Sequence, residues 1–231
     1  MSAPPAPKTL ARIAGCLYLT VAVLTIFAGL VNTRIVEPGD IAASATLFRV
    51  GLVSELVGAT AFLSTGMALY LLLKHVNRPV AAAMVTFVAV GVAMQSLSLL
   101  NQQAAVTIAT GPGHTAAFGP AGADQLTLLF AGLQHDGYLI AQTYFGLWLL
   151  PLGYLVGKSG YFPKALGILL VIGCFGHLVD VFARLLAPGF GAAISPFAMT
   201  PAAVAEISFI VWLLVKAVRV PVRQGGNRVL P

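Results

Sequence analysis

Six long apolar runs, separated by short segments rich in Gly and Pro, divide this sequence. Each run holds about 20 residues or more, the length of α-helix that crosses a hydrocarbon core of about 30 Å. In lipid every backbone N–H and C=O must be paired within the protein, so only helices and closed barrels can span a bilayer. The predicted membrane spans are about 13–31, 48–73, 80–108, 126–156, 165–186 and 202–218.

The low charge content supports the same class. Hydrophobic residues make up 58% of the chain and charged residues only 9%, whereas a soluble domain carries about 25% charged residues. A membrane barrel would show segments of about ten residues with alternating polarity, and the apolar runs here are unbroken. We therefore predict an all-α membrane protein, a bundle of six transmembrane helices in which residues 1–231 form one domain.

The fourth run, about 126–156, is too long for one straight crossing. We expect its outer end to project from the membrane or Pro151 to kink it. A break near residues 134–137 would instead give two crossings, but the inner piece would then have no partner crossing to balance the topology.

The distribution of Lys and Arg predicts the orientation, because cytoplasmic loops carry an excess of these residues. With six spans, one side of the membrane receives Lys8, Arg12, Lys74, Arg78, Lys158, Lys164, Lys216, Arg219, Arg223 and Arg228. The other side receives Arg34, Arg49 and Arg184. Both termini are therefore predicted to be cytoplasmic. A basic surface that faces anionic lipid also explains the net charge of +6 without nucleic acid as a partner.

Ionisable residues inside the predicted spans are the candidates for function, because each charge at mid-bilayer costs about 2.5–3.5 kcal/mol. They are Glu55, His135, Asp136, His177, Asp180, Arg184 and Glu206. At a rise of 1.5 Å per residue, these positions fall in the outer half of the bilayer and are distributed over four spans. The sequence thus predicts one polar pocket there, in which Glu55, His177, Asp180 and Glu206 meet and His135 lies near the floor.

Helical spacing indicates which other residues face this pocket. Gln95 and Gln102 share one face of the third span, and His135, Tyr138 and Gln142 share one face of the fourth. Small residues accompany the polar ones, as in Gly51 and Gly58 beside Glu55, and small residues mark close helix contacts in membranes.

Structural roles are an alternative for each of these residues. Asp180 and Arg184 stand four residues apart and can neutralise each other. Glu55 can pair with Arg49 or Arg184, and the Gln side chains can simply join helices. Clustering across several spans, rather than any single residue, favours a functional site.

Several segments resemble a bacterial membrane family catalogued as domain of unknown function 4386. They are residues 11–19, 145–155, 158–167, 205–206 and 211–216, with Phe145-Gly146-Leu147-Trp148 and Leu149-Leu150-Pro151-Leu152-Gly153 at the centre. The resemblance extends over nearly the whole chain. It implies a multi-pass protein of the bacterial cytoplasmic membrane, and since the family has no assigned activity it implies no catalytic residue.

Three classes of function fit the sequence. A binding or transport protein would use the pocket for a small ligand, a cation or a proton. An intramembrane metal-dependent enzyme would hold a divalent metal through His135, His177, Asp180 and Glu206, which are suitable ligand types. A structural or sensory subunit would use the polar cluster only to join helices. A haem between His135 and His177 is a weaker alternative. No known reaction signature is present, so binding or transport ranks first.

Overall fold

The computed structural model describes residues 6–34 and 38–218, and these ranges are almost entirely helical. The helices are α1 (Pro7–Asn32), α2 (Pro38–Ala43), α3 (Ala45–Leu73), α4 (Arg78–Thr110), α5 (Pro112–Leu147), α6 (Leu149–Lys158), α7 (Lys164–Leu186) and α8 (Pro188–Val215). Six helices in this part of the chain are long and apolar enough to cross a membrane, with α5 and α6 together counted as one. The predicted six-helix membrane bundle is confirmed in this respect.

The long fourth crossing is interrupted at Trp148, between α5 and α6. Pro151 has no N–H and so cannot donate to the carbonyl of Leu147, four residues earlier. The backbone bonds on either side persist, from Trp148 to Tyr144 at 3.1 Å and from Leu152 to Trp148 at 3.2 Å. The proline expected to kink this span therefore lies one turn after the observed break.

Two segments expected to be loops are helical, which corrects the predicted boundaries. Residues 112–125 belong to α5, which contains one non-helical residue, Gly119, at φ 70° and ψ 165°. Residues 188–201 form the first half of α8, although Pro196 and Pro201 lie inside it. Gly and Pro in these segments predict helix breaks, but Pro112 and Pro188 instead occupy first-turn positions, where a missing N–H costs nothing.

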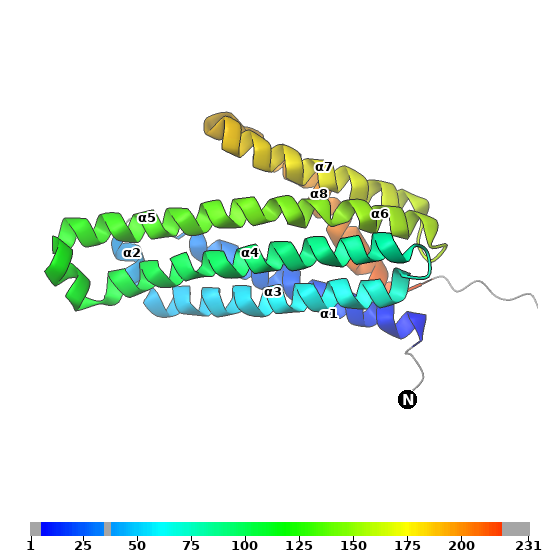
Figure 1. The fold of residues 1–231 in the computed structure, drawn as a ribbon, viewed down its shortest axis with the longest axis horizontal. Coiled ribbons are helices and arrows are strands. Elements are labelled where there is room, and N and C mark those ends of the chain that lie inside the picture. Colours follow the sequence, from blue (N-terminus) through cyan, green and yellow to red (C-terminus); the bar gives the residue numbers. More distant parts are fainter. Residues whose placement is uncertain (1–5, 35–37, 219–231) are drawn as a thin grey trace, which may run out of the picture.

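The membrane-length helices form a closed ring. In order around the ring, α1 packs on α3, α3 on α4, α4 on α5, α5 and α6 on α7, α7 on α8, and α8 on α1. All of them run roughly along the long axis in Figure 1. One end of the bundle contains the start of α1, the connection between α3 and α4, and the connection between α6 and α7. We call this the basic end, because Lys8, Lys74, Lys158, Lys164 and Lys216 lie there.

Glycines bring the helices into close contact near the basic end. A Cβ added to Gly153 on α6 would lie 2.6 Å from the carbonyl oxygen of Gly167 on α7. A Cβ on Gly15 of α1 would lie 2.9 Å from Cβ of Leu213 on α8. Because only glycine permits such approach, these contacts fix where α7 and α8 meet the rest of the ring.

Toward the opposite end, the α7–α8 pair leans away from α5 (Figure 1). The two helices of this pair stay in contact, since a Cβ on Gly176 of α7 would lie 2.4 Å from the carbonyl oxygen of Ala198 on α8. The pair thus diverges as a unit, and the interior of the ring widens toward that end. The predicted basic residues Arg219, Arg223 and Arg228 lie outside the described residues.

Candidate ligand-binding cavities

Two adjoining cavities lie inside the ring, one near the middle of the bundle and one toward the end away from the basic end. The central cavity has a volume of about 340 Å³ and is lined by residues that include Tyr18, Phe62, Trp148, His177 and Glu206. The end cavity has a volume of about 610 Å³. Four residues line both cavities: Thr25, Ile26, Tyr138 and Gln142. The cavities therefore share a wall made by α1 and α5.

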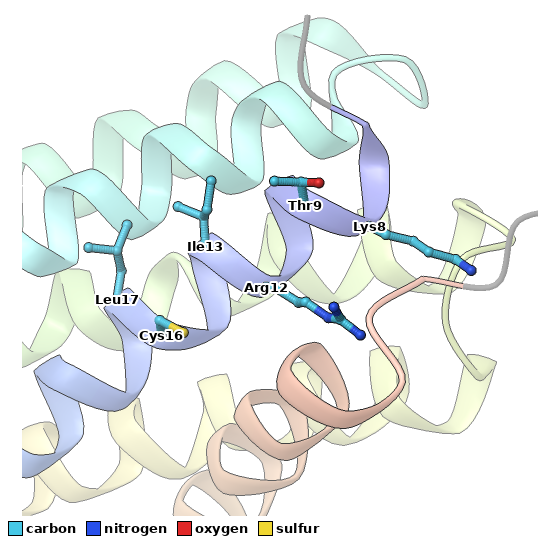
Figure 2. A pocket seen from close by; sticks show the side chains of 6 residues that line it. All are labelled: Lys8, Thr9, Arg12, Ile13, Cys16 and Leu17. Carbon is cyan, nitrogen blue, oxygen red and sulfur yellow. The ribbon is translucent and has the colours of Figure 1, made fainter.

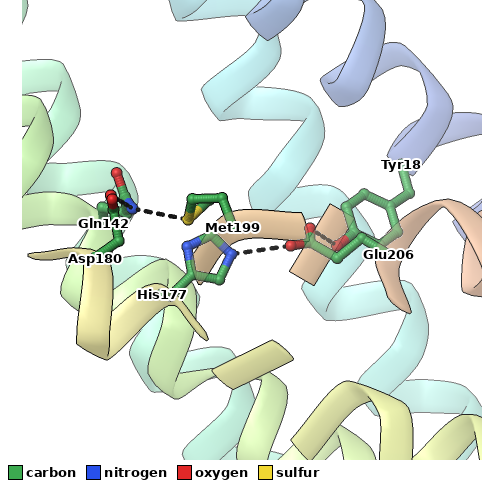
Figure 3. Close-up of polar contacts among 6 residues, drawn as sticks. All are labelled: Tyr18, Gln142, His177, Asp180, Met199 and Glu206. Atoms are coloured by element: carbon green, nitrogen blue, oxygen red, sulfur yellow. Dashed lines mark hydrogen bonds and ion pairs between the residues drawn. The ribbon is translucent and has the colours of Figure 1, made fainter. Parts of the chain in front are cut away.

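Glu206 on α8 is the carboxylate of the central cavity. Its Oε1 lies 3.0 Å from His177 Nε2 on α7, and its Oε2 accepts a hydrogen bond from the Tyr18 hydroxyl on α1 (Figure 3). The side chain of His177 is 10% exposed and that of Glu206 is 25% exposed. Three helices that are distant in sequence thus contribute to one polar contact. A carboxylate offers about four acceptor positions, so Glu206 retains room for a further donor.

His177 is held close to α5 by a glycine. A Cβ on Gly146 would lie 2.6 Å from Cβ of His177, so no larger residue fits there without displacement. The other ring nitrogen of His177, Nδ1, is buried and has no hydrogen-bond partner among the described residues. In Figure 3 this nitrogen lies on the side of the ring toward Met199 and Gln142, which also line the central cavity.

A second set of polar contacts extends from Gln142 and Met199 toward the end of the bundle opposite the basic end. Gln142 donates to Asp180 Oδ2 at 3.0 Å and contacts the sulfur of Met199 at 3.4 Å (Figure 3). Arg184 donates through Nε to Asp180 Oδ1 at 3.2 Å and through a terminal nitrogen to Ser195 at 2.6 Å. The Asp180–Arg184 pair proposed from spacing is therefore formed, and it joins α7 to both α5 and α8.

Glu55 on α3 is the carboxylate of the end cavity. It is 5% exposed. Its two oxygens accept from amide groups, Asn32 Nδ2 at 3.2 Å and Gln95 Nε2 at 3.4 Å. No Lys, Arg or His among the described residues forms an ion pair with Glu55. The structure therefore does not form the pairing of Glu55 with Arg49 or Arg184 that the sequence left open.

Gln102 extends the Glu55 network toward the end of the bundle. Its amide nitrogen lies 3.4 Å from Asn32 Oδ1 and 3.5 Å from the carbonyl of Phe48. Its own carbonyl oxygen is buried without a partner among the described residues. The predicted polar stripe of α4 thus faces the interior of the ring, where Gln95 lines the central cavity.

The structure divides the predicted single pocket between the two cavities. His177 and Glu206 line the central cavity, and Glu55, His135 and Arg184 line the end cavity. His135 is exposed and lines the end cavity, and its place near a floor stays a prediction. No group of three or more His, Cys, Asp or Glu residues in the described ranges is placed to hold a metal ion. A metal site formed by His135, His177, Asp180 and Glu206, like a haem, stays a prediction.

Sequence reasoning did not assign a role to four residues of these networks: Tyr18, Asn32, Ser195 and Met199. Tyr18 lies in the first apolar run and Asn32 directly follows it, and neither carries a charge. Ser195 and Met199 lie in a segment expected to be a loop. Helical spacing can be applied to Ser195 and Met199 only when this segment is known to be part of α8, which begins at Pro188.

Two further hollows lie near the basic end and belong to the outer surface. One is lined by Lys8, Thr9, Arg12, Ile13, Cys16 and Leu17. These residues come from α1 alone, and Lys8 and Arg12 point toward the basic end (Figure 2). The other follows α4, α6 and α7 and includes Lys158 and Lys164. Lys158 lies on α6 and Lys164 on α7, but this hollow, like the first, lies outside the ring that encloses the two cavities.

Comparison with known proteins places the chain in a family. The family described as Domain of unknown function (DUF4386) matches residues 13–217. The chain belongs to this family. An uncharacterised protein of Archaeoglobus fulgidus is 37% identical over 73 residues, which are 32% of this chain and 41% of that protein. No solved structure matches. The family predicted from the sequence is thus confirmed, and it brings no activity with it.

Proposed function

We propose that this protein binds a small ligand inside the membrane, in the central cavity, as a binding protein or transporter. The observation that carries the proposal is the placement of two carboxylates, Glu55 and Glu206, on adjoining cavities within the ring. Both cavities fall within the range of about 300–1,000 Å³ that is usual for small-molecule sites.

Open volume beside the polar groups distinguishes a binding site from polar contacts that only join helices. Protein interiors are close-packed, and voids larger than a water molecule are few. A polar network whose only role is to join helices needs no cavity beside it. Here the hydrogen-bonded groups from α1, α5, α7 and α8 border open volume, which supports a role in contacting a further molecule.

The proposed ligand reaches the cavities from outside the cytoplasmic membrane. The end cavity is lined by Asn32 and Thr33, at the end of α1 away from Lys8. By the positive-inside rule the basic end is cytoplasmic, so the wider end of the ring faces outward. This orientation supports uptake, release or sensing of a ligand at the outer face.

Fluorescence of Trp148 offers a direct test. The chain has two tryptophans, and of these Trp148 lines the central cavity. A Trp212→Phe variant in neutral-lipid nanodiscs therefore reports on the cavity. The probes are benzylammonium, benzyltrimethylammonium, benzyl alcohol and benzoate, which share one ring and differ in charge.

We expect at least one probe to change Trp148 fluorescence saturably. Adding Ala203→Phe should abolish that response, because Ala203 lines the cavity and is exposed enough to accept a larger side chain. Val204→Phe is the matched control, since Val204 is 49% exposed and does not line the cavity. The proposal fails if no probe gives a saturable response, or if both Phe substitutions affect it equally.

A further inference from the structure

The charge lining the central cavity is negative or neutral. Its ionisable side chains are Glu206, His177 and the two tyrosines Tyr18 and Tyr138, and no Lys or Arg of the described residues lines it. The cation near the adjoining cavity, Arg184, is already bonded to Asp180 and Ser195. A ligand with a positive charge is therefore attracted by the Glu206 carboxylate, and an anion is repelled by it.

Aromatic rings form the wall of the cavity toward the basic end. Tyr18, Phe62, Phe145 and Trp148 all line it. Their centroids lie 4.9 Å apart for Phe62–Trp148, 5.4 Å for Phe62–Phe145 and 5.5 Å for Tyr18–Trp148. Aromatic faces attract cations within about 6 Å of the centroid, most strongly where water is excluded. The same rings also supply apolar surface for an uncharged body.

Hydrogen-bond acceptors dominate the polar groups at the Glu206 side. When His177 Nε2 donates its hydrogen to Glu206, the neutral ring leaves Nδ1 as an acceptor. That nitrogen is buried and has no partner among the described residues. Nδ1 points away from Glu206, so the acceptor positions open to a ligand are those that remain on the Glu206 carboxylate. These positions are best matched by a ligand that carries N–H donors.

The cavity also borders the lipid-facing surface between α1 and α8. Ile26 on α1 is 64% exposed and Ile207 on α8 is 60% exposed, and both line the cavity together with the exposed Ala203. The two helices touch at Gly15 and Leu213 near the basic end. A molecule with an apolar body can therefore approach from the bilayer at this side.

From these four features we infer that the central cavity takes a protonated organic amine with an apolar, preferably aromatic body. Its ammonium group contacts Glu206, and its body lies against Tyr18, Phe62 and Trp148. This inference rests on the proposed function, because it names the ligand class for the same cavity.

The four benzyl probes separate the ligand class from the existence of the site. In the Trp212→Phe protein, benzylammonium should bind at least tenfold more tightly than benzyl alcohol, and benzoate should bind more weakly than either. Benzyltrimethylammonium has the charge but no N–H donor, so it should bind more weakly than benzylammonium. Neutral lipid in the nanodiscs prevents cations from accumulating at the membrane surface.

Each departure from this order has a distinct meaning. Benzyl alcohol or benzoate binding as tightly as benzylammonium, with the response still lost in Ala203→Phe, overturns the amine class and leaves the binding function intact. The absence of binding by all four probes overturns both. A quaternary probe that binds as tightly as benzylammonium overturns the donor role assigned to the N–H groups.

Glu206→Gln sharpens the assignment of the charge. It should remove the tenfold preference for benzylammonium over benzyl alcohol, while Glu55→Gln, at the other cavity, should leave most of it. An unchanged preference in a folded Glu206→Gln protein contradicts the inference. If that variant does not fold, the order of the four probes on the Trp212→Phe protein still decides the ligand class.

Discussion

The two halves of the bundle differ in how their helices are held together. Near the basic end, a continuous core contains the fully buried Leu69, Leu73, Leu152 and Leu155, and glycines bring α6 and α7 into backbone contact. Near the opposite end, the buried apolar cluster is small and comprises Val31, Ile41, Phe48, Ala105 and Val106. There, amide, carboxylate and hydroxyl groups form hydrogen bonds between the helices.

This difference shows how one bundle can combine stability with open space. In lipid the association of helices depends on close packing and hydrogen bonds, since lipid tails are as apolar as the side chains. The basic half uses close packing in its interior, and its two hollows belong to the outer surface. From the middle of the bundle toward the opposite end, long polar side chains connect the diverging helices and border the two cavities.

The largest contrast concerns the side of the membrane that each end faces. Ser159 lies at the end of α6 and Thr115 at the start of α5, at opposite ends of the bundle. In intact cells a membrane-impermeant thiol reagent should label Thr115→Cys and should label Ser159→Cys only after permeabilisation. Labelling of Ser159→Cys in intact cells would reverse the assigned orientation.

Close packing at the basic half predicts opposite effects for two glycines of α6. Gly153→Ala places a Cβ 2.6 Å from a backbone oxygen of α7, and overpacking of this kind costs about 1–3 kcal/mol. Gly157→Ala meets no atom within 4 Å and should stabilise the helix by about 0.5–1 kcal/mol. Unfolding in detergent measures both. Similar stability of the two variants would show that the α6–α7 contact is looser than described.

Polar contacts in the opposite half should have graded effects. Arg184→Gln leaves Asp180, which is 2% exposed, with Gln142 as its remaining partner. Breaking a fully buried pair costs about 3–5 kcal/mol. Because the Arg184 side chain is 30% exposed, we expect about 1–3 kcal/mol.

Glu206→Gln provides the comparison for Arg184→Gln. The amide can still bond to Tyr18 and His177, so the expected loss of stability is about 1 kcal/mol or less. Thermal unfolding of the two purified variants ranks them. A larger loss for Glu206→Gln would place the main structural role on the central cavity instead of the Asp180–Arg184 pair.

Sequence alone predicted the class and the number of crossings because hydrophobic length in a bilayer is a strong constraint. It also predicted the inward direction of Glu55, Gln95, His177 and Asp180, since helical periodicity fixes which residues share a face. The Asp180–Arg184 pair followed from spacing of four residues within one helix. All these signals are local to a single helix.

Contacts between helices were not accessible in the same way. The bond between Tyr18 and Glu206 joins residues 188 positions apart, and no periodicity relates them. The division into two cavities depends on where α7 and α8 diverge, which is set by glycine contacts whose partners the sequence does not name.

Thiol accessibility along α1 tests the contrast between the two halves most directly. In a protein with Cys16→Ser and Cys174→Ala, a single cysteine is placed at Ala14, which is fully buried in the basic half, or at Thr25, which lines both cavities. A water-soluble, positively charged methanethiosulfonate should modify Thr25→Cys at least tenfold faster than Ala14→Cys in nanodiscs. Equal rates at the two positions, or an unreactive cysteine at Thr25, would contradict the presence of an open, solvent-connected cavity in one half of the bundle.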